Sequence, residues 1–406
     1  MIKFKWETEF KQTEIGELPQ EWKLDDIDSY LSEIIDYRGK TPKKSAFGII
    51  TLSAKSIKNG KIDYSKVYFI SEETFKKWER RGKPKVGDVL LTTEGPLGEV
   101  AQLDRENVAV SQRLLVLRGK KGLLDNTYLK YYLMSPIGQH ELLSRATGTT
   151  VEGIRQSEFR QIFVVLPSFS EQCRIAAVLS WFDDLIENKK RQNEILEKTA
   201  MAIFKSWFVD FEPFKDEEFV YNEELGKEIL KGWEVKPIGE VVDILYGKGL
   251  PESKRKNGSF PVVGSSGIVG YHAQFLATPL SIVIGRKGNA GSVYLMLEPF
   301  YPIDTVFYTG KTTPAKTFYI YHYLKLTPLA EIGMTDTAVP GININNLKAV
   351  KIPIPPQPIL QHFHSLVEPL FQKIILNQKQ IMVLRKIRDA LLPKLVFGKL
   401  RVEVVE

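Results

Sequence analysis

The sequence of 406 residues contains one pattern twice, and this repeat constrains the fold more than any other feature. Each copy is a mixed segment that ends in a long helical pattern, and these two patterns begin near Ser170 and Pro358. The aligned blocks recur in the same order with slowly drifting offsets, which argues against chance similarity of short apolar strings. The blocks pair Trp22 with Trp233, Val89-Leu90-Leu91 with Ile282-Val283-Ile284, Tyr128 with Tyr319, Gly153-Ile154 with Gly341-Ile342, and Gln172 with Gln361.

Each copy opens with short runs of β-type residues bounded by turns that contain glycine or proline, and a helical stretch follows. The predicted strands are residues 48–52, 88–92 and 108–110 in the first copy and 260–263, 281–284 and 305–308 in the second. The helical stretches are 125–146, broken near Pro136, and 315–325. The pattern predicts an α/β fold with two globular domains, 1–169 and 213–356, each followed by one long helix, 170–212 and 357–406.

Both long helices carry a stripe with steps of three and four residues, as a coiled-coil seam requires. The predicted seam positions are Val178, Trp181, Leu185, Asn188, Gln192, Ile195, Thr199 and Ala202 in the first helix, and Val367, Leu370, Ile374, Asn377, Ile381, Leu384, Arg388 and Leu391 in the second. We expect the two helices to pack antiparallel as a coiled coil that separates the two domains, with an internal pseudo-two-fold repeat. Asn188 and Asn377 are expected at matching seam positions.

The ends of the long helices carry their own signals. Ser170 is expected to cap the first helix, with Glu171 at its positive end. Pro369 predicts a kink or a late start in the second helix. The alternative to a spacer is a single globule in which both helices belong to one core.

The composition is that of a soluble globular protein, with 43% hydrophobic and 26% charged residues. No apolar run reaches the roughly 18 residues that span a bilayer, and charges occupy the N-terminus where a signal peptide needs an apolar stretch. The single cysteine, Cys173, cannot form an internal disulfide. We therefore expect a cytoplasmic protein without a membrane partner. The net charge of +7 is compatible with a polyanionic partner without establishing one.

Several strings resemble one protein family, the specificity subunit of type I restriction–modification systems. The strings are Gly148-Thr149-Thr150-Val151-Glu152-Gly153-Ile154, Leu166-Pro167, Ser170-Glu171-Gln172, Phe204-Lys205-Ser206-Trp207-Phe208-Val209-Asp210-Phe211, Ala338-Val339-Pro340-Gly341-Ile342, Ile352-Pro353-Ile354-Pro355-Pro356 and Leu391-Leu392-Pro393-Lys394-Leu395. Domains that end in an apolar-proline strand and continue into a long helix with a central asparagine complete the resemblance, which covers nearly the whole chain. The second copy departs from the family pattern at Leu360-Gln361, where an acid is missing.

The resemblance implies two target-recognition domains, each of which reads half of a split site in double-stranded DNA. It also implies a non-catalytic subunit without a cofactor. Two modification (methyltransferase) subunits would dock on the helices, and restriction subunits would join them. Adenine methylation and ATP-dependent DNA cleavage would then belong to those other subunits.

Sequence readout requires side chains that reach base edges, while lysine and arginine bind phosphates. In the first domain, a basic loop with an aromatic residue and polar side chains at predicted strand ends fit these roles. The predicted DNA-binding residues are Tyr37, Arg38, Lys40, Thr41, Lys55, Thr93, Glu94, Gln112 and Arg113. Arginine can pair with guanine, glutamine with adenine and glutamate with cytosine. The alternative for the basic loop is an ordinary solvated surface.

The counterparts in the second domain are dominated by a basic pair between glycines, which lets the backbone approach DNA closely. The predicted residues are Tyr246, Lys248, Ser265, Ser266, Arg286, Lys287 and Asn289. The segment aligned with Arg286 and Lys287 is Thr92-Thr93-Glu94-Gly95, which is acidic. This difference predicts two unlike half-sites and an asymmetric target.

The rival interpretations are a catalyst and a structural coiled-coil adaptor. Gly39-Lys40-Thr41 and Gly310-Lys311-Thr312 resemble the end of a phosphate-binding loop, but the earlier glycine of that motif is absent. The Asn-Pro-Pro-aromatic string of amino-methyltransferases is absent too, and five histidines with one cysteine predict no metal centre. An adaptor explains the helices but not the paired α/β domains with their basic loops.

Overall fold

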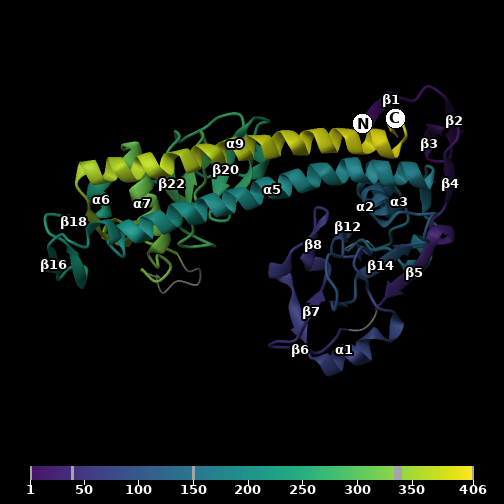
Figure 1. Cartoon of the computed structure of the whole chain (residues 1–406), viewed down its shortest axis with the longest axis horizontal. Helices are drawn as coiled ribbons and strands as arrows, with labels where there is room; N and C mark the ends of the chain where they lie inside the picture. The colour runs from purple at the N-terminus through teal and green to yellow at the C-terminus, as the bar shows by residue number, and fades with distance from the viewer. Residues whose placement is uncertain (1, 38–40, 149–150, 333–340, 405–406) are drawn as a thin grey trace. The chain divides into compact units, whose positions relative to one another are not determined.

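The computed structural model describes residues 2–37, 41–148, 151–332 and 341–404. The chain forms two compact units: unit 1 contains residues 1–187 and 381–406, and unit 2 contains residues 188–380. Two continuous helices of 40 residues each, α5 (Phe169–Phe208) and α9 (Gln357–Val396), contribute one part to each unit (Figure 1). Both long helices predicted from the repeat are present, and α5 lies within a few residues of its predicted bounds. The predicted C-terminal end of the second helix is wrong, because α9 ends at Val396 and the strand β27 (Leu400–Val404) follows it.

Unit 1 combines short strands with small helices. Its strands are β1 (Ile2–Trp6), β2 (Phe10–Thr13), β3 (Gly16–Pro19), β4 (Lys23–Asp26), β5 (Leu31–Asp36), β6 (Lys44–Ser45), β7 (Ile49–Leu52), β8 (Ile57–Lys58), β9 (Lys61–Ile62), β10 (Tyr68–Ile70), β11 (Val89–Thr93), β12 (Leu97–Gln102), β13 (Ala109–Val110), β14 (Leu114–Gly119), β15 (Phe163–Leu166) and β27 (Leu400–Val404). Its small helices are α1 (Glu72–Trp78), α2 (Asn126–Met134), α3 (Pro136–Ser144) and α4 (Gln156–Phe159). An antiparallel sheet of order β12-β11-β14-β5 lies at its centre, beside a mixed sheet of order β13-β7-β10-β6.

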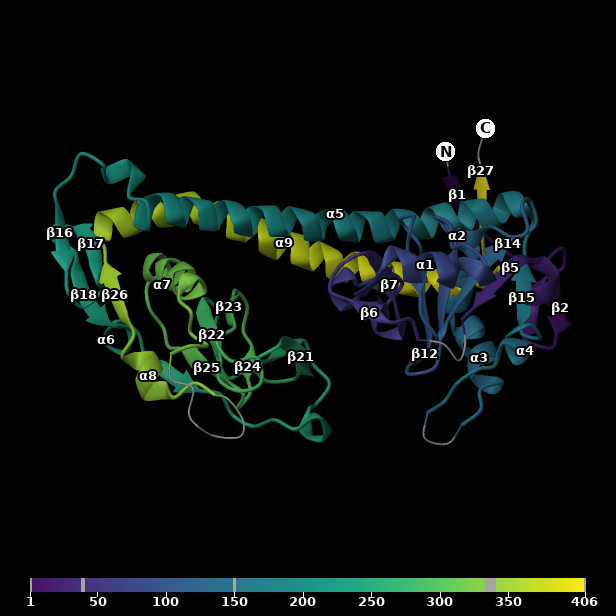
Figure 2. The ribbon, with the colours of Figure 1, turned by 90° about the horizontal axis from the view of Figure 1, so that it is seen from below.

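Unit 2 repeats this plan with fewer elements. Its strands are β16 (Phe219–Asn222), β17 (Lys227–Leu230), β18 (Glu234–Pro237), β19 (Ile244–Tyr246), β20 (Phe260–Gly264), β21 (Gly267–His272), β22 (Ser281–Gly285), β23 (Val293–Met296), β24 (Tyr301–Pro302), β25 (Val306–Thr309) and β26 (Lys351–Ile354). Its small helices are α6 (Ile238–Val241), α7 (Pro314–Leu326) and α8 (Ile344–Lys348). Helix α7 packs against β22 and β23 of the central sheet, as Figure 2 shows.

The sheet topology confirms the repeat. The central sheet of unit 2 has the order β19-β25-β22-β23, which matches β5-β14-β11-β12 of unit 1 strand by strand. Each unit also has one parallel strand pair, β13 with β7 in unit 1 and β24 with β20 in unit 2. Between β7 and β11, unit 1 contains three further strands and α1, whereas unit 2 has only β21 at this place. The second copy is therefore shorter than the first before its strand β22.

The repeated tyrosines tie a helix to a strand in both units. The Tyr128 and Tyr132 hydroxyls of α2 donate to the carbonyl oxygens of Val165 and Phe163 in β15, at 2.9 and 2.6 Å. In unit 2 the Tyr319 and Tyr323 hydroxyls of α7 donate in the same way to carbonyl oxygens of β26, at 2.5 and 3.0 Å. A buried phenol needs a hydrogen-bond partner, and a carbonyl at the strand provides one. The tyrosine spacing in the sequence thus corresponds to the same helix-to-strand hydrogen bonds in both units.

Within each unit the two long helices are antiparallel. In unit 2, Asn193 of α5 contacts Asn377 of α9, and further along α5 the ring of Phe204 packs on Phe363 with ring centroids 5.9 Å apart. In unit 1, Asp183 of α5 forms an ion pair with Arg388 of α9. As residue numbers rise along α5, those of its contacts on α9 fall, which confirms the predicted orientation.

The seam predicted for α9 is correct, but the one predicted for α5 is displaced by one residue. Of the predicted positions Val178 is buried, but Trp181, Leu185 and Ile195 are 54%, 48% and 63% exposed. The buried positions of α5 follow the neighbouring stripe: Ile175, Leu179, Ile186, Ala200, Phe204 and Phe208. Helix α5 has two apolar stripes about 100° apart, and spacing alone does not reveal which one faces the partner helix.

The asparagine pairing changes with the seam. Asn377 is fully buried, and its Nδ2 donates to Asn193 Oδ1 at 2.9 Å and to Gln192 Oε1 at 3.3 Å. Asn188 is exposed, so the predicted match of Asn188 with Asn377 is wrong. The buried polar contact still has the properties of one that sets helix register, because an apolar neighbour would leave the Asn377 amide without a partner.

The helix ends also differ from the prediction. Ser168, not Ser170, caps α5, since its side-chain oxygen accepts from the Glu171 amide at 3.3 Å and its carbonyl accepts from the Gln172 amide at 2.9 Å. The Glu171 carboxylate is buried and receives hydrogen bonds from Arg401 and Trp22. Helix α9 begins at Gln357, twelve residues before Pro369, and continues past this proline without a break. The predicted late start is therefore not observed.

Candidate nucleic-acid interface

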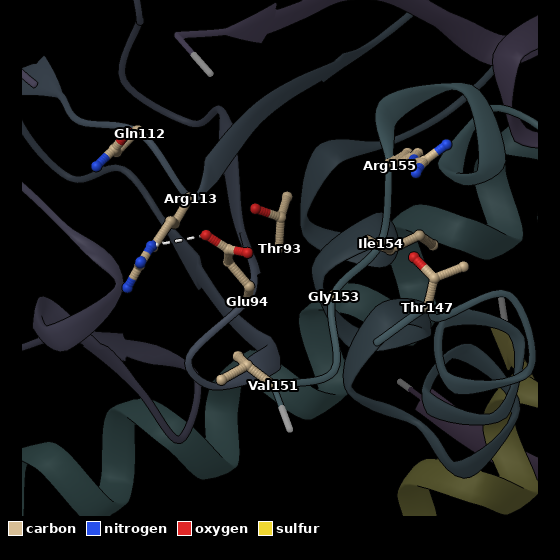
Figure 3. A pocket seen from close by; sticks show the side chains of 9 residues that line it. All are labelled: Thr93, Glu94, Gln112, Arg113, Thr147, Val151, Gly153, Ile154 and Arg155. Atoms are coloured by element: carbon tan, nitrogen blue, oxygen red, sulfur yellow. Dashed lines mark ion pairs between the residues drawn. The ribbon is translucent and has the colours of Figure 1, made fainter. Parts of the chain in front are cut away.

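The end of β11 in unit 1 borders a hollow of about 240 Å³. We call it the Glu94 hollow; its lining residues are Thr93, Glu94, Gln112, Arg113, Thr147, Val151, Gly153, Ile154 and Arg155. Figure 3 shows Glu94 between Arg113 on one side and the segment of Gly153 and Ile154 on the other. Three segments that are distant in sequence therefore meet at this hollow.

Backbone hydrogen bonds hold the three segments together. The Thr93 amide donates to the Arg113 carbonyl at 3.0 Å, and the Ile154 amide donates to the Thr93 carbonyl at 2.9 Å. Arg113 has a φ of 72°, a left-handed conformation that is uncommon for a residue with a side chain. Gly95 has a φ of 56° and ends the β11 strand. The side chains of Glu94 and Arg113 thus project from a fixed backbone.

Glu94 and Arg113 form an ion pair at the rim of the hollow. Arg113 Nε lies 2.7 Å from Glu94 Oε1, and the two side chains are 53% and 43% exposed. An ion pair this exposed stabilises a fold by at most about 1 kcal/mol. Its main consequence is orientation, because the carboxylate fixes the plane of the guanidinium group.

A second and larger hollow, of about 400 Å³, shares Gln112 and Arg113 with the first. We call it the lysine hollow; its other lining residues are Thr41, Lys44, Ser53, Ala54, Lys55, Lys66, Val67, Tyr68, Gly95 and Ser111. The Lys44 ammonium lies 5.0 Å from the centroid of the Tyr68 ring. Three lysines and one arginine around hydroxyl groups make this surface suitable for phosphate oxygens.

The structure brings most of the predicted unit 1 residues together. Six of them line the two hollows: Thr41, Lys55, Thr93, Glu94, Gln112 and Arg113. Tyr37 differs, because it is buried, its hydroxyl donates to the Gly82 carbonyl at 2.7 Å, and its ring stacks on Trp78. Tyr37 is therefore a packing residue, which its position beside a basic segment did not indicate. Arg38 and Lys40 lie outside the described residues.

In unit 2, Arg286 lies at the end of β22 above two aromatic rings. Its guanidinium carbon is 5.1 Å from the Tyr246 ring centroid and 5.9 Å from that of Phe307, and its Nη1 donates to the Asp304 carbonyl at 3.3 Å. A cation over an aromatic face is attracted by the ring quadrupole, so the two rings help to hold the guanidinium group at this strand end.

The other predicted unit 2 residues surround Arg286. The Ser265 hydroxyl accepts from the Asn289 amide at 3.4 Å, and the Ser265 amide donates to Thr305 Oγ1 at 3.3 Å. Ser265 is itself buried and so positions the loop. The remaining predicted side chains are exposed: Tyr246, Lys248, Ser266, Lys287 and Asn289. The Lys248 amide donates to the carbonyl of Pro302, which places Lys248 beside the same strand ends.

The hydrogen bonds identify equivalent positions in the two units. The Arg286 amide donates to the Thr305 carbonyl and the Ile342 amide donates to the Arg286 carbonyl, as Thr93 does with Arg113 and Ile154. Arg286 therefore matches Thr93, Lys287 matches Glu94 and Thr305 matches Arg113. Bridges of Glu94 with Gly153 and of Lys287 with Gly341 agree. Matched positions thus carry an acid in one unit and a base in the other.

Sequence reasoning missed several residues of these surfaces. They are Lys66, Tyr68, Thr147, Val151 and Arg155 in unit 1, and Asp304 and Phe307 in unit 2. Arg155 had a usable signal, since it directly follows the repeated Gly153-Ile154. Lys66 had none, because only the fold places its turn beside Lys44 and Lys55.

Two further findings concern other classes of site. Across the described ranges, no cluster of three or more histidine, cysteine or acidic side chains is arranged to hold a metal ion. The helices in the described part of the chain lack the combination of length and apolar character that a bilayer crossing demands.

The chain is similar to known proteins over most of its length. A family model described as the type I restriction modification DNA specificity domain matches residues 24–198 and 230–386. The type I restriction enzyme MjaIX specificity subunit of Methanocaldococcus jannaschii is 39% identical over an alignment that covers 99% of each chain. The HindI specificity subunit of Haemophilus influenzae is 20% identical, and the alignment covers 78% of this chain and 87% of that protein.

A solved structure shares the fold. The crystal structure of a type I restriction–modification S subunit from M. genitalium has a TM-score of 0.55 and 21% identity, and the match covers 92% of this chain and 96% of that one. The two family-model matches contain the central sheet of unit 1 and that of unit 2, respectively. Since that model covers most of the chain and one relative is 39% identical over its full length, the chain belongs to the family of type I restriction–modification DNA specificity subunits.

Proposed function

We propose that this chain reads an asymmetric, two-part sequence in double-stranded DNA, with one half-site bound by each unit, and that it carries no catalytic step itself. One observation carries the proposal: the predicted residues gather at the same strand ends of both units, with different chemistry at matched positions. Unit 1 offers Glu94 and Arg113 where unit 2 offers Lys287 and Thr305. Equal folds with unlike contact residues suit two different half-sites.

Arg286→Ala is expected to weaken or relax recognition of one half-site only. The guanidinium group that rests on Tyr246 and Phe307 is removed, while unit 1 keeps its full surface. A lost bidentate base contact costs about 1–3 kcal/mol of discrimination. Competition binding with each half-site scrambled in turn measures the effect.

The matched control for this experiment is Lys231→Ala. Lys231 is an exposed cation of unit 2 that pairs with Glu218 at 2.7 Å and lies outside the surface around Arg286. This variant removes one positive charge, as Arg286→Ala does, but it leaves the surface around Arg286 unchanged. It should therefore bind both half-sites as wild type does. An equal loss at both half-sites for Arg286→Ala argues against the division of the target between the units.

We also propose that two modification (methyltransferase) subunits dock on the long helices and that restriction subunits complete the complex. Exposed apolar side chains on these helices support a protein partner, because large apolar groups on a free surface favour burial. Two such pairs lie on the helices in unit 1, Trp181 with Leu185 on α5 and Val383 with Ile387 on α9. Within each pair the two residues are about one helical turn apart. In unit 2 they are Ile195, Leu366 and Leu376.

Trp181→Ser is expected to weaken binding of the modification subunit by about 10-fold or more, since an exposed tryptophan is the side chain most often found at the energetic centre of an interface. Calorimetric titration of the full-length variant with the modification subunit, in the absence of DNA, measures the change in affinity. Phe47→Ser is the control, because Phe47 is 82% exposed but lies outside the long helices. Equal affinity of Trp181→Ser and wild type contradicts docking on this face.

A further inference from the structure

Arg113 is the one charged side chain that lines both hollows of unit 1. We infer that Arg113 reads a guanine base in the half-site bound by unit 1, and that Glu94 is a positioning residue for Arg113 and not a base contact. This inference rests on the proposed function, because it assumes that unit 1 faces DNA. It adds the identity of the base and separates the roles of the two side chains.

The free edge of the Arg113 guanidinium group indicates the base. Its Nε lies 2.7 Å from Glu94 Oε1, so that edge of the group is occupied. The edge formed by its two Nη groups presents two parallel N–H donors. Guanine offers two acceptors side by side in the major groove, O6 and N7, whereas adenine offers one acceptor and one donor there. Two parallel donors therefore match guanine and mismatch adenine.

The surroundings leave this edge accessible. The Arg113 side chain is 53% exposed. A Cβ atom at Gly95 would lie 3.6 Å from Arg113 Nη1, so the glycine keeps the space beside this nitrogen open. The backbone of Arg113 is held by its carbonyl, which accepts from the Thr93 amide. A side chain that reads a base requires a fixed backbone and an accessible functional group, and Arg113 has both.

Glu94 alone is a poor base contact in this arrangement. A free carboxylate can accept from the amino group of cytosine, but Glu94 is already in an ion pair with Arg113. The pair is neutral as a whole, which removes the repulsion that an isolated carboxylate experiences beside phosphates. The carboxylate thus holds the guanidinium plane in place before DNA arrives and reduces the rotamer freedom that binding must remove.

The lysine hollow provides candidate contacts to the DNA backbone beside Arg113. Lys44, Lys55 and Lys66 line the lysine hollow, whereas Gly153 lines the Glu94 hollow, and Arg113 borders both. Lysine binds phosphate as a point charge. These lysines would hold the DNA backbone while Arg113 reaches the adjacent base edge. In unit 2 the position of Arg113 is occupied by Thr305, so this guanine contact has no counterpart at the matched position.

Selection of oligonucleotides from a random pool tests the inference, with the full chain assembled with its modification subunits. Wild type should select a two-part site with an invariant guanine at one or more positions. Arg113→Ala should lose the guanine preference at one position of one half-site and keep all other positions. Its affinity for the wild-type site should fall roughly 5- to 150-fold.

Glu94 variants separate positioning from base contact. Glu94→Ala should relax the preference at the same single position as Arg113→Ala, whereas Glu94→Gln, whose amide oxygen can still accept from Nε, should retain guanine there. Lys55→Ala is the control: it should weaken binding to every sequence about equally and lower the slope of log affinity against log salt by about 1.

Two results overturn the inference. Retention of guanine at every position by Arg113→Ala rules out its role as the reader. A loss of preference at a different G·C pair in Glu94→Ala, with the pair read by Arg113 retained, shows that Glu94 itself contacts a base. Both differ from failure of the proposed function, in which wild type selects no two-part site at all.

Discussion

Removal of one heptad from each long helix is expected to reduce affinity for the native DNA site on the order of 100-fold or more, because only one half-site can then be bound in its specific register. Seven residues correspond to about 10.5 Å of helix. DNA rises about 3.4 Å per base pair, so the two units would meet the duplex about three base pairs from their native positions. The measurement is competition binding to the selected site.

The segments to remove are residues 184–190 of α5 and 381–387 of α9. They lie between two contacts that remain in the shortened protein, the ion pair of Asp183 with Arg388 and the amide contact of Asn193 with Asn377. A heptad preserves the seam, since it is close to two full helical turns. The heptad pattern of the seam is therefore preserved in the shortened helices.

The control replaces four exposed polar side chains of the same two segments, Asp184, Asn188, Arg385 and Lys386, by alanine at unchanged length. This variant should bind the native site with wild-type affinity. The two proteins then share the loss of these exposed side chains, and only the control keeps the native helix length. Wild-type site preference in the shortened protein would show that helix length does not set the spacing of the half-sites.

Asp183→Asn is expected to destabilise unit 1 by about 3 kcal/mol, because it leaves the poorly exposed Lys130 without its carboxylate partner and leaves Arg388 with Asp389 alone. Lys130 Nζ lies 3.3 Å from Asp183 Oδ2 and Arg388 Nη1 lies 2.6 Å from Oδ1, while the Tyr131 hydroxyl donates to the carboxylate at 2.7 Å. Asp183 is only 14% exposed. Hydrogen exchange of the amides in α2 measures the loss for unit 1 separately.

The same carboxylate predicts a pH dependence. Burial raises the pKa of Asp183, but Lys130, the Tyr131 hydroxyl and Arg388 outweigh it and hold the pKa below its ordinary value. Asp183 is then protonated at a higher pH in the unfolded chain, near its ordinary pKa of about 4, than in the folded chain. The stabilising contribution is therefore complete above about pH 4 and is lost as the pH falls through the folded pKa.

The stability difference between wild type and Asp183→Asn should accordingly be constant from pH 7 to about pH 5 and shrink toward pH 3. Asp184→Asn is the control, since Asp184 is the next residue of α5 and is exposed. This variant should unfold like wild type at every pH. A difference for Asp183→Asn that persists unchanged at pH 3 would assign the effect to packing and not to charge.

The order of elements was predictable because it depends on local patterns. Short runs of β-type residues between turns located β7, β11, β20 and β22, and the break at Pro136 separated α2 from α3. The repeat located two long helices and the matching tyrosines. Each of these signals arises from neighbours in the chain, whose spacing sets which side chains share a face.

The candidate surfaces were predictable in part. Strand ends with polar residues identified Glu94, Gln112 and Arg113, and a basic pair between glycines identified Arg286. The ion pair of Glu94 with Arg113 was not predictable, because the two residues lie on different strand ends that meet only in the folded sheet. Tyr37 and Lys66 show the same limit in opposite directions: one is drawn into the core and the other is brought to the lysine hollow.

The sequence by itself therefore determined the duplicated α/β plan, the two long helices and the family of the chain. The tertiary structure alone decided which stripe of α5 is buried, which asparagine meets Asn377 and which polar side chains form one surface. The physical reason is that periodicity defines a face of a helix or strand, whereas burial depends on what packs against that face. Contacts between distant segments follow from that packing and leave no trace in local spacing.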